Sequence, residues 1–197
     1  MRSIGARLRH SAPRFLDPIA HVVTSGTPLA APGRLATEED RPTPVMPRRS
    51  EQASDALTAQ GVRSSVVRLP QVHDTVKQGL VSYLIAVARD KGVSAYVGEG
   101  LNRWPAVHRL DAAPIYRLAI EKGTAGSCYH AIAEEGVPLR EIAEAIGRGL
   151  KIPAVSISPE EAGSHFGWLG FFAGSTVLLQ AHSRRNGWDG ARQRCLG

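Results

Sequence analysis

The chain has 197 residues, of which 43% are hydrophobic, and this length is enough for one domain with a hydrophobic core. No stretch of about 18 consecutive apolar residues occurs, so the sequence predicts no membrane-spanning helix and no membrane partner. The two cysteines, Cys128 and Cys195, lie far apart and match no metal or redox spacing, which favours a reduced, cytoplasmic setting.

The formal net charge of +6 is concentrated at the two ends of the chain. The basic N-terminal segment 1–20 and the basic C-terminal tail 183–197 each hold four arginines and one aspartate, so each carries +3 and the body between them sums to zero. A nucleic-acid binder usually gathers charge on a folded face among aromatic residues, so we expect no specific nucleic-acid partner. The arginine-rich start is also typical of a transit peptide, but we interpret it as a poorly ordered start or part of a larger domain.

In the body, residues 21–182, short apolar runs alternate with helical patterns, which predicts an α/β domain. The expected strands are His21–Gly26, Ser64–Leu69, Ser94–Val97, a run ending at His108, Ser127–Ala133 and Ala154–Ser158. The expected helices are 50–60, 74–91, 111–122, 137–150 and one that begins at Pro159. Residues 27–47 are rich in proline, glycine and threonine and read as a loop.

The most informative stretch lies around the run that ends at His108. Trp104 and His108 are expected near the carboxyl end of that strand, and Asp111 is expected as the N-cap of the next helix. Ligands of open α/β sheets bind at that edge, so Arg103, Trp104 and His108 form a candidate substrate cluster of a fixed cation, an aromatic surface and a titratable ring. The alternative is that Trp104 packs on the following helix and His108 bonds to the backbone.

Three segments also resemble a known family: RLPxVH, NRWPAVHRLDAAxxYRLAxEK and YHAxAEEGVPxREIAEAIG. Their order resembles the C-terminal half of an extended short-chain dehydrogenase/reductase of the NAD-dependent epimerase/dehydratase family, over roughly 22–188 and most specifically over 64–169. The resemblance implies a partial Rossmann-type parallel sheet, whose N-terminal dinucleotide-binding half is missing, and a small C-terminal α/β substrate lobe. It further implies NAD or NADP as cofactor and a small-molecule substrate, with homo-oligomers left open.

The resemblance also implies roles for particular residues. Ser25 corresponds to the residue that holds the substrate oxygen, and with His108 it is a candidate catalytic residue. The positions that it places beside the cofactor are Thr24, Pro70, Val72 and His73. The alternatives are that Ser25 belongs to a turn and that His73 is an exposed loop residue. The pair Glu134–Glu135 resembles a catalytic dyad but is more simply interpreted as a solvated loop.

Two features of the family are absent from the sequence. No Gly-x-Gly-x-x-Gly follows a strand, and no Tyr occurs between Ser25 and Tyr83, while the first Lys is Lys77. Glu51 stands where the relay lysine is expected, which reverses the charge. We therefore expect an epimerase/dehydratase-like oxidoreductase that is truncated and impaired. The alternatives are a non-catalytic binding or regulatory module and an incomplete gene product.

Overall fold

The computed structural model describes residues 19–27, 34, 36–42 and 49–176. The predicted basic tail and nearly all of the predicted basic N-terminal segment lie outside these residues. The division into three parts therefore stays a prediction. None of the helices that the structure describes combines the length and the apolar character that a membrane span requires.

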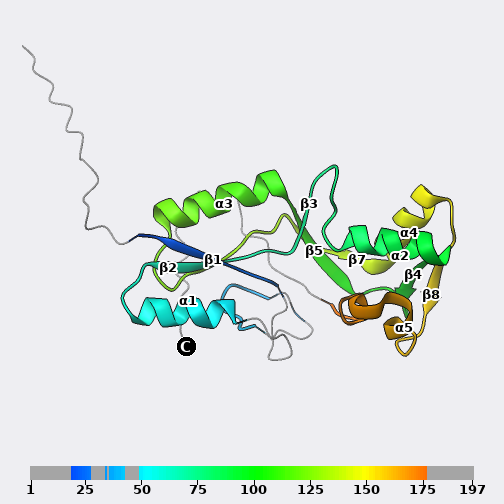
Figure 1. Ribbon diagram of the computed structural model, residues 1–197, viewed down its shortest axis with the longest axis horizontal. Helices are drawn as coiled ribbons and strands as arrows, with labels where there is room; N and C mark the ends of the chain where they lie inside the picture. The colour runs from blue at the N-terminus through cyan, green and yellow to red at the C-terminus, as the bar shows by residue number, and fades with distance from the viewer. Residues whose placement is uncertain (1–18, 28–33, 35, 43–48, 177–197) are drawn as a thin grey trace, which may run out of the picture.

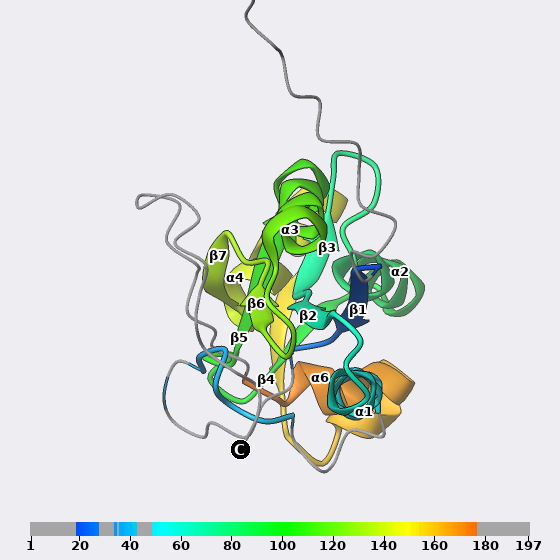
Figure 2. The same ribbon diagram turned by 90° about the vertical axis from the view of Figure 1, so that its left-hand side faces the viewer.

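A three-stranded parallel sheet forms one end of the molecule (Figure 1). Its strands, in spatial order, are β1 (His21–Ser25), β2 (Ser64–Arg68) and β6 (Cys128–His130). Helix α1 (Ser50–Ala59) covers one face and helix α3 (Arg109–Lys122) covers the other, as Figure 2 also shows. Every residue of β2 is buried, as expected for the central strand of a sheet with helices on both faces.

The remaining elements form a second sheet and a helical lobe at the other end (Figure 1). The second sheet consists of β3 (Gln71–His73), β5 (Arg103–His108) and β7 (Glu134–Pro138), in the order β3-β5-β7. The lobe contains the parallel pair β4 (Ser94–Val97) and β8 (Ala154–Ile157), with helices α2 (Val81–Lys91), α4 (Leu139–Leu150), α5 (Ala162–Phe166) and α6 (Gly170–Ala173) and a 3-10 turn, η1 (Gly167–Leu169).

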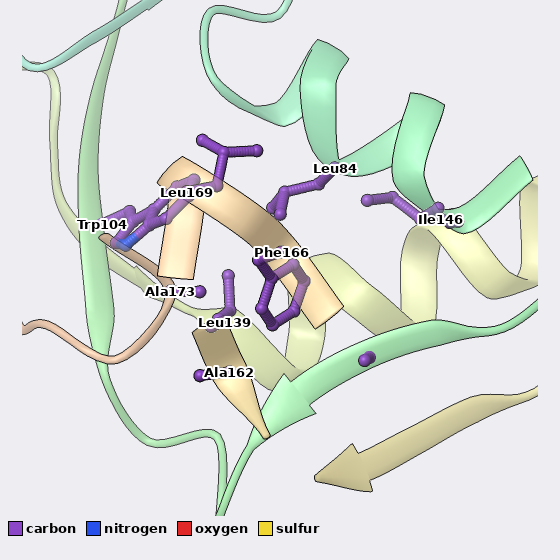
Figure 3. Packing of buried hydrophobic residues seen from close by; sticks show 10 residues of the cluster. Leu84, Trp104, Leu139, Ile146, Ala162, Phe166, Leu169 and Ala173 are labelled. Atoms are coloured by element: carbon purple, nitrogen blue, oxygen red, sulfur yellow. The ribbon is translucent and has the colours of Figure 1, made fainter. Parts of the chain in front are cut away.

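Two hydrophobic clusters hold the fold together. The first lies in the lobe and joins α2, α4 and α5 around Leu84, Leu139, Phe166 and Leu169 (Figure 3). The second lies between the first sheet and α3, around Val67, Val107 and Tyr129. Helix α4 packs its apolar face into the lobe, because its apolar residues recur at helical spacing.

The predicted fold class is confirmed: parallel strands and helices form Rossmann-type layers with a smaller α/β lobe. The predicted strand Ser94–Val97 has the predicted bounds, and the strands at 21–25 and 64–68 and the helix at 50–59 match within one residue.

Several predicted boundaries were wrong. The strand predicted over Ser127–Ala133 spans only Cys128–His130, and the helix expected from Pro159 begins at Ala162. Three further differences have a local reason. Helix α2 begins at Val81, seven residues after the predicted start, because the Asp74 carboxylate accepts the N–H groups of Val76 and Lys77 in a turn and Gly79 adopts φ +57°. The N-cap of α3 is His108, whose Nδ1 accepts the Leu110 N–H at 3.3 Å, and Asp111 lies in the first turn.

The third correction concerns Glu134 and Glu135, which open strand β7 and do not lie in a loop. Strand β7 pairs antiparallel with β5, and the register shifts between Trp104 and Ala106, where Pro105 cannot donate to the ladder. As a consequence Val137 and Pro138 belong to the strand, and helix α4 begins only at Leu139.

Candidate functional site

Three polar side chains end the three strands of the first sheet. Ser25, Arg68 and His130 are the last residues of β1, β2 and β6, and the ladder registers pair Ser25 with Arg68 and Arg68 with His130. Residues in register on parallel strands point to the same face, so these side chains form one row. All three are buried, with exposed fractions of 6%, 0% and 1%. The sheet therefore carries a polar row at its carboxyl edge.

Arg68 is paired with Glu51, the second residue of α1. Its Nε donates to Glu51 Oε1 at 2.9 Å and its Nη2 donates to Oε2 at 2.8 Å, a two-point ion pair. Glu51 is also buried, with 4% of its surface exposed. Burying either charge alone would cost several kcal/mol, so the pair is a structural unit of the fold.

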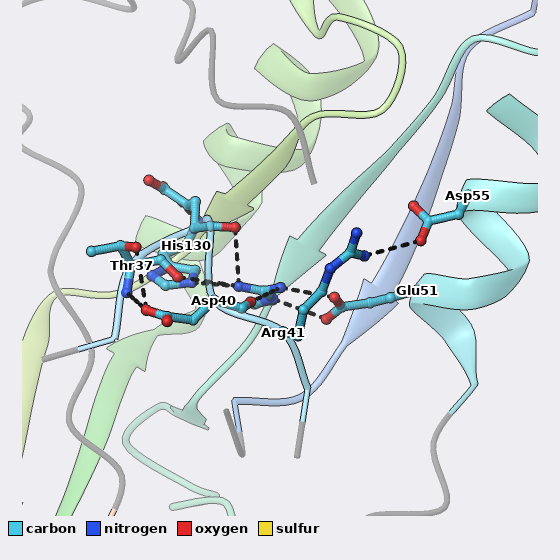
Figure 4. A network of polar contacts seen from close by, with 8 residues as sticks. Thr37, Asp40, Arg41, Glu51, Asp55 and His130 are labelled. Carbon is cyan, nitrogen blue, oxygen red and sulfur yellow. Dashed lines mark hydrogen bonds and ion pairs between the residues drawn. The ribbon is translucent and has the colours of Figure 1, made fainter. Parts of the chain in front are cut away.

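The remaining donors of Arg68 bind the loop 37–40 and His130. Figure 4 shows Thr37, Asp40, Glu51 and His130 gathered around this network. Nη2 donates to the Asp40 carbonyl at 2.7 Å, and Nη1 lies 3.3 Å from the Thr37 carbonyl and 3.4 Å from the Glu38 carbonyl. Nη1 also lies 3.2 Å from His130 Nε2. Each guanidinium nitrogen thus has an acceptor, and Arg68 holds the loop against the edge of the sheet.

The contact with Arg68 assigns the tautomer of His130. A guanidinium can only donate, so His130 Nε2 accepts and the ring proton lies on Nδ1. The backbone N–H of His130 donates to Glu38 Oε1 at 3.1 Å, which adds a second tie to the loop. His130 is therefore a neutral acceptor within the network around Arg68.

The loop itself is held by an ion pair between Arg34 and Asp40. Arg34 Nη1 donates to Asp40 Oδ2 at 2.8 Å, and the Thr37 N–H donates to the same oxygen at 2.8 Å. The hydrogen bond from Arg34 is the main reason that the pKa of Asp40 is lowered to about 2, against the opposing effect of burial. Asp40 is therefore charged throughout the neutral range.

Ser25 and Thr24, adjacent in β1, point to opposite faces of the sheet. Thr24 Oγ1 lies 2.7 Å from the hydroxyl of Tyr116 on α3, so the Thr24 side chain is engaged with the helix. Burial raises the pKa of Tyr116, and the hydrogen bond with Thr24 opposes that shift. The predicted cofactor residue Thr24 and the predicted catalytic residue Ser25 therefore face different layers.

A second polar group gathers where β3 and β5 end. His73 and His108 are paired in register, and their ring centroids lie 5.5 Å apart in an edge-to-face arrangement. His73 Nε2 lies 3.9 Å from Glu134 Oε2. Because His108 Nδ1 accepts the Leu110 N–H, its Nε2 carries the proton in the neutral ring. The structure thus brings the predicted residues His73 and His108 together, at an edge reached by solvent.

Asp74 and Arg109 extend this group. Arg109 Nε lies 3.0 Å from Asp74 Oδ2. The pKa of Asp74 is lowered, chiefly by the N–H groups of Lys77 and Val76 and less by Arg109. Asp74 is therefore a charged acceptor that shapes the turn before α2. Among the described residues, no group of three or more His, Cys, Asp or Glu side chains has the geometry of a metal site.

The remaining predicted residues lie in different surroundings. Pro70 and Val72 are half-buried, and Val72 packs against the hydrophobic cluster beneath α3. Trp104 is the second residue of β5, so its expected position at the carboxyl edge was wrong. It is 4% exposed in the core of the lobe, and its Nε1 donates to the Phe172 carbonyl at 3.0 Å. Arg103 is exposed and donates to the Gly136 carbonyl at 2.9 Å.

A groove of about 790 Å³ runs between helices α2 and α4. His73 lies at its wall, while Trp104 and Ala106 of β5 contribute to its floor. The groove is therefore adjacent to the histidine pair, and the row of Ser25, Arg68 and His130 contributes nothing to its lining.

The roles of three residues in the polar contacts were not predicted from the sequence: Arg68, His130 and Tyr116. A signal existed for Arg68, because an arginine within the β-branched run SSVVRL predicts a buried charge that needs a partner. A comparable signal exists for His130 in the predicted strand SCYHAIA. The pairing of Tyr116 with Thr24 joins positions 92 residues apart, which no local pattern indicates.

No family model matches the chain. An uncharacterized protein of Schizosaccharomyces pombe is 49% identical over 168 residues, which is 81% of this chain and 56% of that protein. An uncharacterized protein of Saccharomyces cerevisiae is 40% identical over 172 residues, 84% of this chain and 58% of that protein. The chain thus spans a little over half the length of the curated relatives that it matches.

Solved structures show the same arrangement of elements at low sequence identity. UDP-glucose 4-epimerase from Thermotoga maritima with UDP-glucose has a TM-score of 0.59 at 15% identity, covering 83% of this chain and 55% of that chain. A dTDP-glucose 4,6-dehydratase from Streptomyces venezuelae with NAD has 0.57 at 18%, covering 82% and 55%. A human epimerase family protein with NADPH has 0.56 at 21%, covering 85% and 59%. These likenesses show the fold.

Proposed function

Because the chain has the fold of the NAD-dependent epimerases and dehydratases, we propose that it is the substrate-side part of an NAD(P)-dependent oxidoreductase or epimerase. The observation that carries this proposal is the row of Ser25, Arg68 and His130 at the carboxyl edge of three parallel strands. Ligands of open α/β sheets bind at that edge. We propose a small molecule as the substrate, and the two widely spaced cysteines favour a cytoplasmic location.

The residues present do not fit the pyrophosphate of a dinucleotide. A pyrophosphate is bound where a glycine-rich turn meets the N-terminus of a helix that follows a strand. In the described part of the chain, the four helices of eight or more residues follow Arg49, Leu80, His108 and Pro138, without a Gly-x-Gly turn at any of them. We therefore expect this chain alone to bind NAD or NADP weakly.

The ordinary proton relay of a tyrosine and a lysine has no counterpart at α1. Glu51 stands at the expected lysine position, and its charge is balanced by Arg68, which is fully buried. A guanidinium whose donors are all engaged does not exchange a proton with a substrate. His73 and His108 end β3 and β5 and reach solvent, and we propose these two imidazoles as the acid–base candidates.

A second candidate function is a non-catalytic module that keeps the fold. The network around Arg68 favours it, because the loop 37–40 is tied by its carbonyls over the polar row that would otherwise face a ligand. Under this function, replacing Ser25 or His108 leaves the biological effect unchanged.

The test is complementation with the S. pombe relative. The chain is purified alone and, separately, coexpressed with the part of that relative which the chain does not match. Nicotinamide fluorescence is then titrated with NADH and with NADPH. The proposal predicts that the added part tightens binding by at least about tenfold.

Two variants separate the two functions in the complemented complex. Ser25→Ala and His108→Asn are compared for any hydride exchange that the complex supports, with the exposed Arg117→Gln as the matched control. Loss of exchange in the first two alone supports the oxidoreductase. A complex that binds no dinucleotide contradicts it and leaves the non-catalytic module.

A further inference from the structure

The groove between α2 and α4 has apolar walls contributed by both helices. Val81 and Ile85 face it from α2, while Ile142 and Ala145 face it from α4. Its volume of about 790 Å³ falls within the roughly 300–1,000 Å³ that is usual for small-molecule sites. Most of the lining is apolar, so an occupant would be held mainly by apolar contact; the acidic lining residues are Glu141 and Glu144 of α4.

Two arginines lie at one end of the groove. Arg89 and Arg148 belong to the last turns of α2 and α4, and both line the groove. On α2, every fourth residue from Val81 through Ile85 to Arg89 lines the groove. The apolar wall therefore runs about 12 Å along the helix and ends at the Arg89 guanidinium. The groove is therefore apolar along its length and cationic at one end.

Neither arginine is neutralised within the described residues. No carboxylate among them forms an ion pair with Arg89 or Arg148. Glu144, which also lines the groove, is engaged by Arg140 Nε at 2.9 Å. Lys151 adds a further cation next to Arg148, where the two line an adjoining pocket together with Glu144, so the two cations outnumber one carboxylate that Arg140 already engages. This end of the groove is thus able to receive an anion.

A basic residue in the last turn of a helix also interacts favourably with the helix dipole. That effect accounts for each arginine separately but does not require both to line one apolar groove. Glu141 lies about two turns before Arg148 on α4, near the opposite end from the arginines. The charge along the groove is therefore asymmetric, and it orients a ligand with its acid toward Arg89 and Arg148.

From these features we propose that the groove binds a small organic anion with an apolar body. The body lies along Val81, Ile85 and Ile142, and the carboxylate is received by Arg89 and Arg148. A sugar would leave its hydroxyl groups without partners on these walls, so the proposed ligand differs in class from the UDP-glucose of the structural neighbour.

The test uses octanoate and 1-octanol, which share an apolar chain and differ in charge. Binding to the full chain is measured by calorimetry without a cofactor. Arg89→Gln/Arg148→Gln removes the cations, and Ala145→Trp fills the groove from an exposed helix position, so neither variant disturbs the core. Arg117→Gln on α3 is the matched control.

The double glutamine variant is expected to weaken octanoate binding by at least about tenfold while leaving octanol binding unchanged. Ala145→Trp is expected to weaken both ligands, and Arg117→Gln neither. Octanoate binding that is unaffected by the double variant overturns the proposal. So does the absence of octanoate binding to the unmodified chain at concentrations up to about 1 mM.

Discussion

Glu51 and Arg68 meet through two parallel hydrogen bonds, 2.9 Å and 2.8 Å long, with both side chains withdrawn from solvent. Glu51 begins α1 and Arg68 ends β2, so the pair ties the helix to the carboxyl edge of the sheet. The same arginine holds three carbonyl groups of the loop 37–40. One buried ion pair therefore joins three separate segments of the chain.

Glu51→Gln is expected to lower the free energy of unfolding by about 3–5 kcal/mol, because it leaves the Arg68 charge buried without a counter-charge. Urea denaturation followed by circular dichroism measures this. Asp55→Asn is the matched control on the same helix, since Asp55 pairs with the exposed Arg41 at 3.3 Å and should cost less than about 1 kcal/mol. Equal losses in the two variants would contradict a structural role for the pair.

Replacing both partners, as Glu51→Leu/Arg68→Met, is expected to cost less than Glu51→Gln alone. No charge is then buried, and apolar groups of similar size take the space. The loop 37–40 loses its anchor in this variant, so protease cleavage in the loop is expected to become faster. An unchanged cleavage rate would show that the loop is held by other contacts.

The contact between Thr24 and Tyr116 joins the first sheet to α3. Thr24→Val and Tyr116→Phe are each expected to cost about 0.5–1 kcal/mol of unfolding free energy, since each removes one partner of a solvent-exposed hydrogen bond. The double variant should cost less than the sum, with a coupling of about 0.5–1 kcal/mol. Strict additivity in this double-mutant cycle would mean that the hydroxyl groups do not interact.

The lowered pKa of Asp40 predicts how the stability of the fold changes in acid. Its folded pKa of about 2 lies below its ordinary value of 3.8, so the folded state binds protons less readily than the unfolded state. The stability from this group is complete above about pH 4 and is lost as the pH falls through about 2. The melting temperature should therefore fall over this window, and Asp40→Asn should remove part of the dependence. An identical pH profile in the variant would contradict the assignment.

Trp104 was predicted to belong to a substrate cluster but lies in the core, and its contribution to stability can be measured. Trp104→Ala is expected to cost about 3–5 kcal/mol, because it empties a packed site and frees the Phe172 carbonyl. Trp168→Ala, at a tryptophan that is 61% exposed, is expected to cost about 1 kcal/mol or less. Chemical denaturation measures the loss of unfolding free energy in both variants. A smaller loss in Trp104→Ala than in Trp168→Ala would contradict the placement of Trp104 in the core.

Local patterns were sufficient for the parts of the fold that depend on local sequence. The strand Ser94–Val97 follows from its short β-type run, helix α1 from its helical spacing, and α4 from its apolar face. The start of α2 could not be predicted from its helical pattern, because the turn at Asp74 and the positive φ of Gly79 delay the helix to Val81. Pro105 likewise permits a bulge that lets β5 pair with β7.

The candidate site was predicted only in part, for a reason of geometry. His73 and His108 each follow from sequence and resemblance, and their contact arises from the pairing of β3 with β5. Arg68, Glu51 and His130 come from three elements, and their network depends on a register that no single segment contains. The roles proposed for Ser25, Pro70 and Val72 stay predictions.

The most direct measurement is a fluorescence titration of the purified chain with NADH and NADPH. We expect no saturable binding below about 100 µM for either dinucleotide, since no helix N-terminus among the described residues fits the pyrophosphate. Saturation at about 1 µM or below would contradict it. Such a result would mean that the chain holds a complete cofactor site of a kind not expected from its glycine pattern.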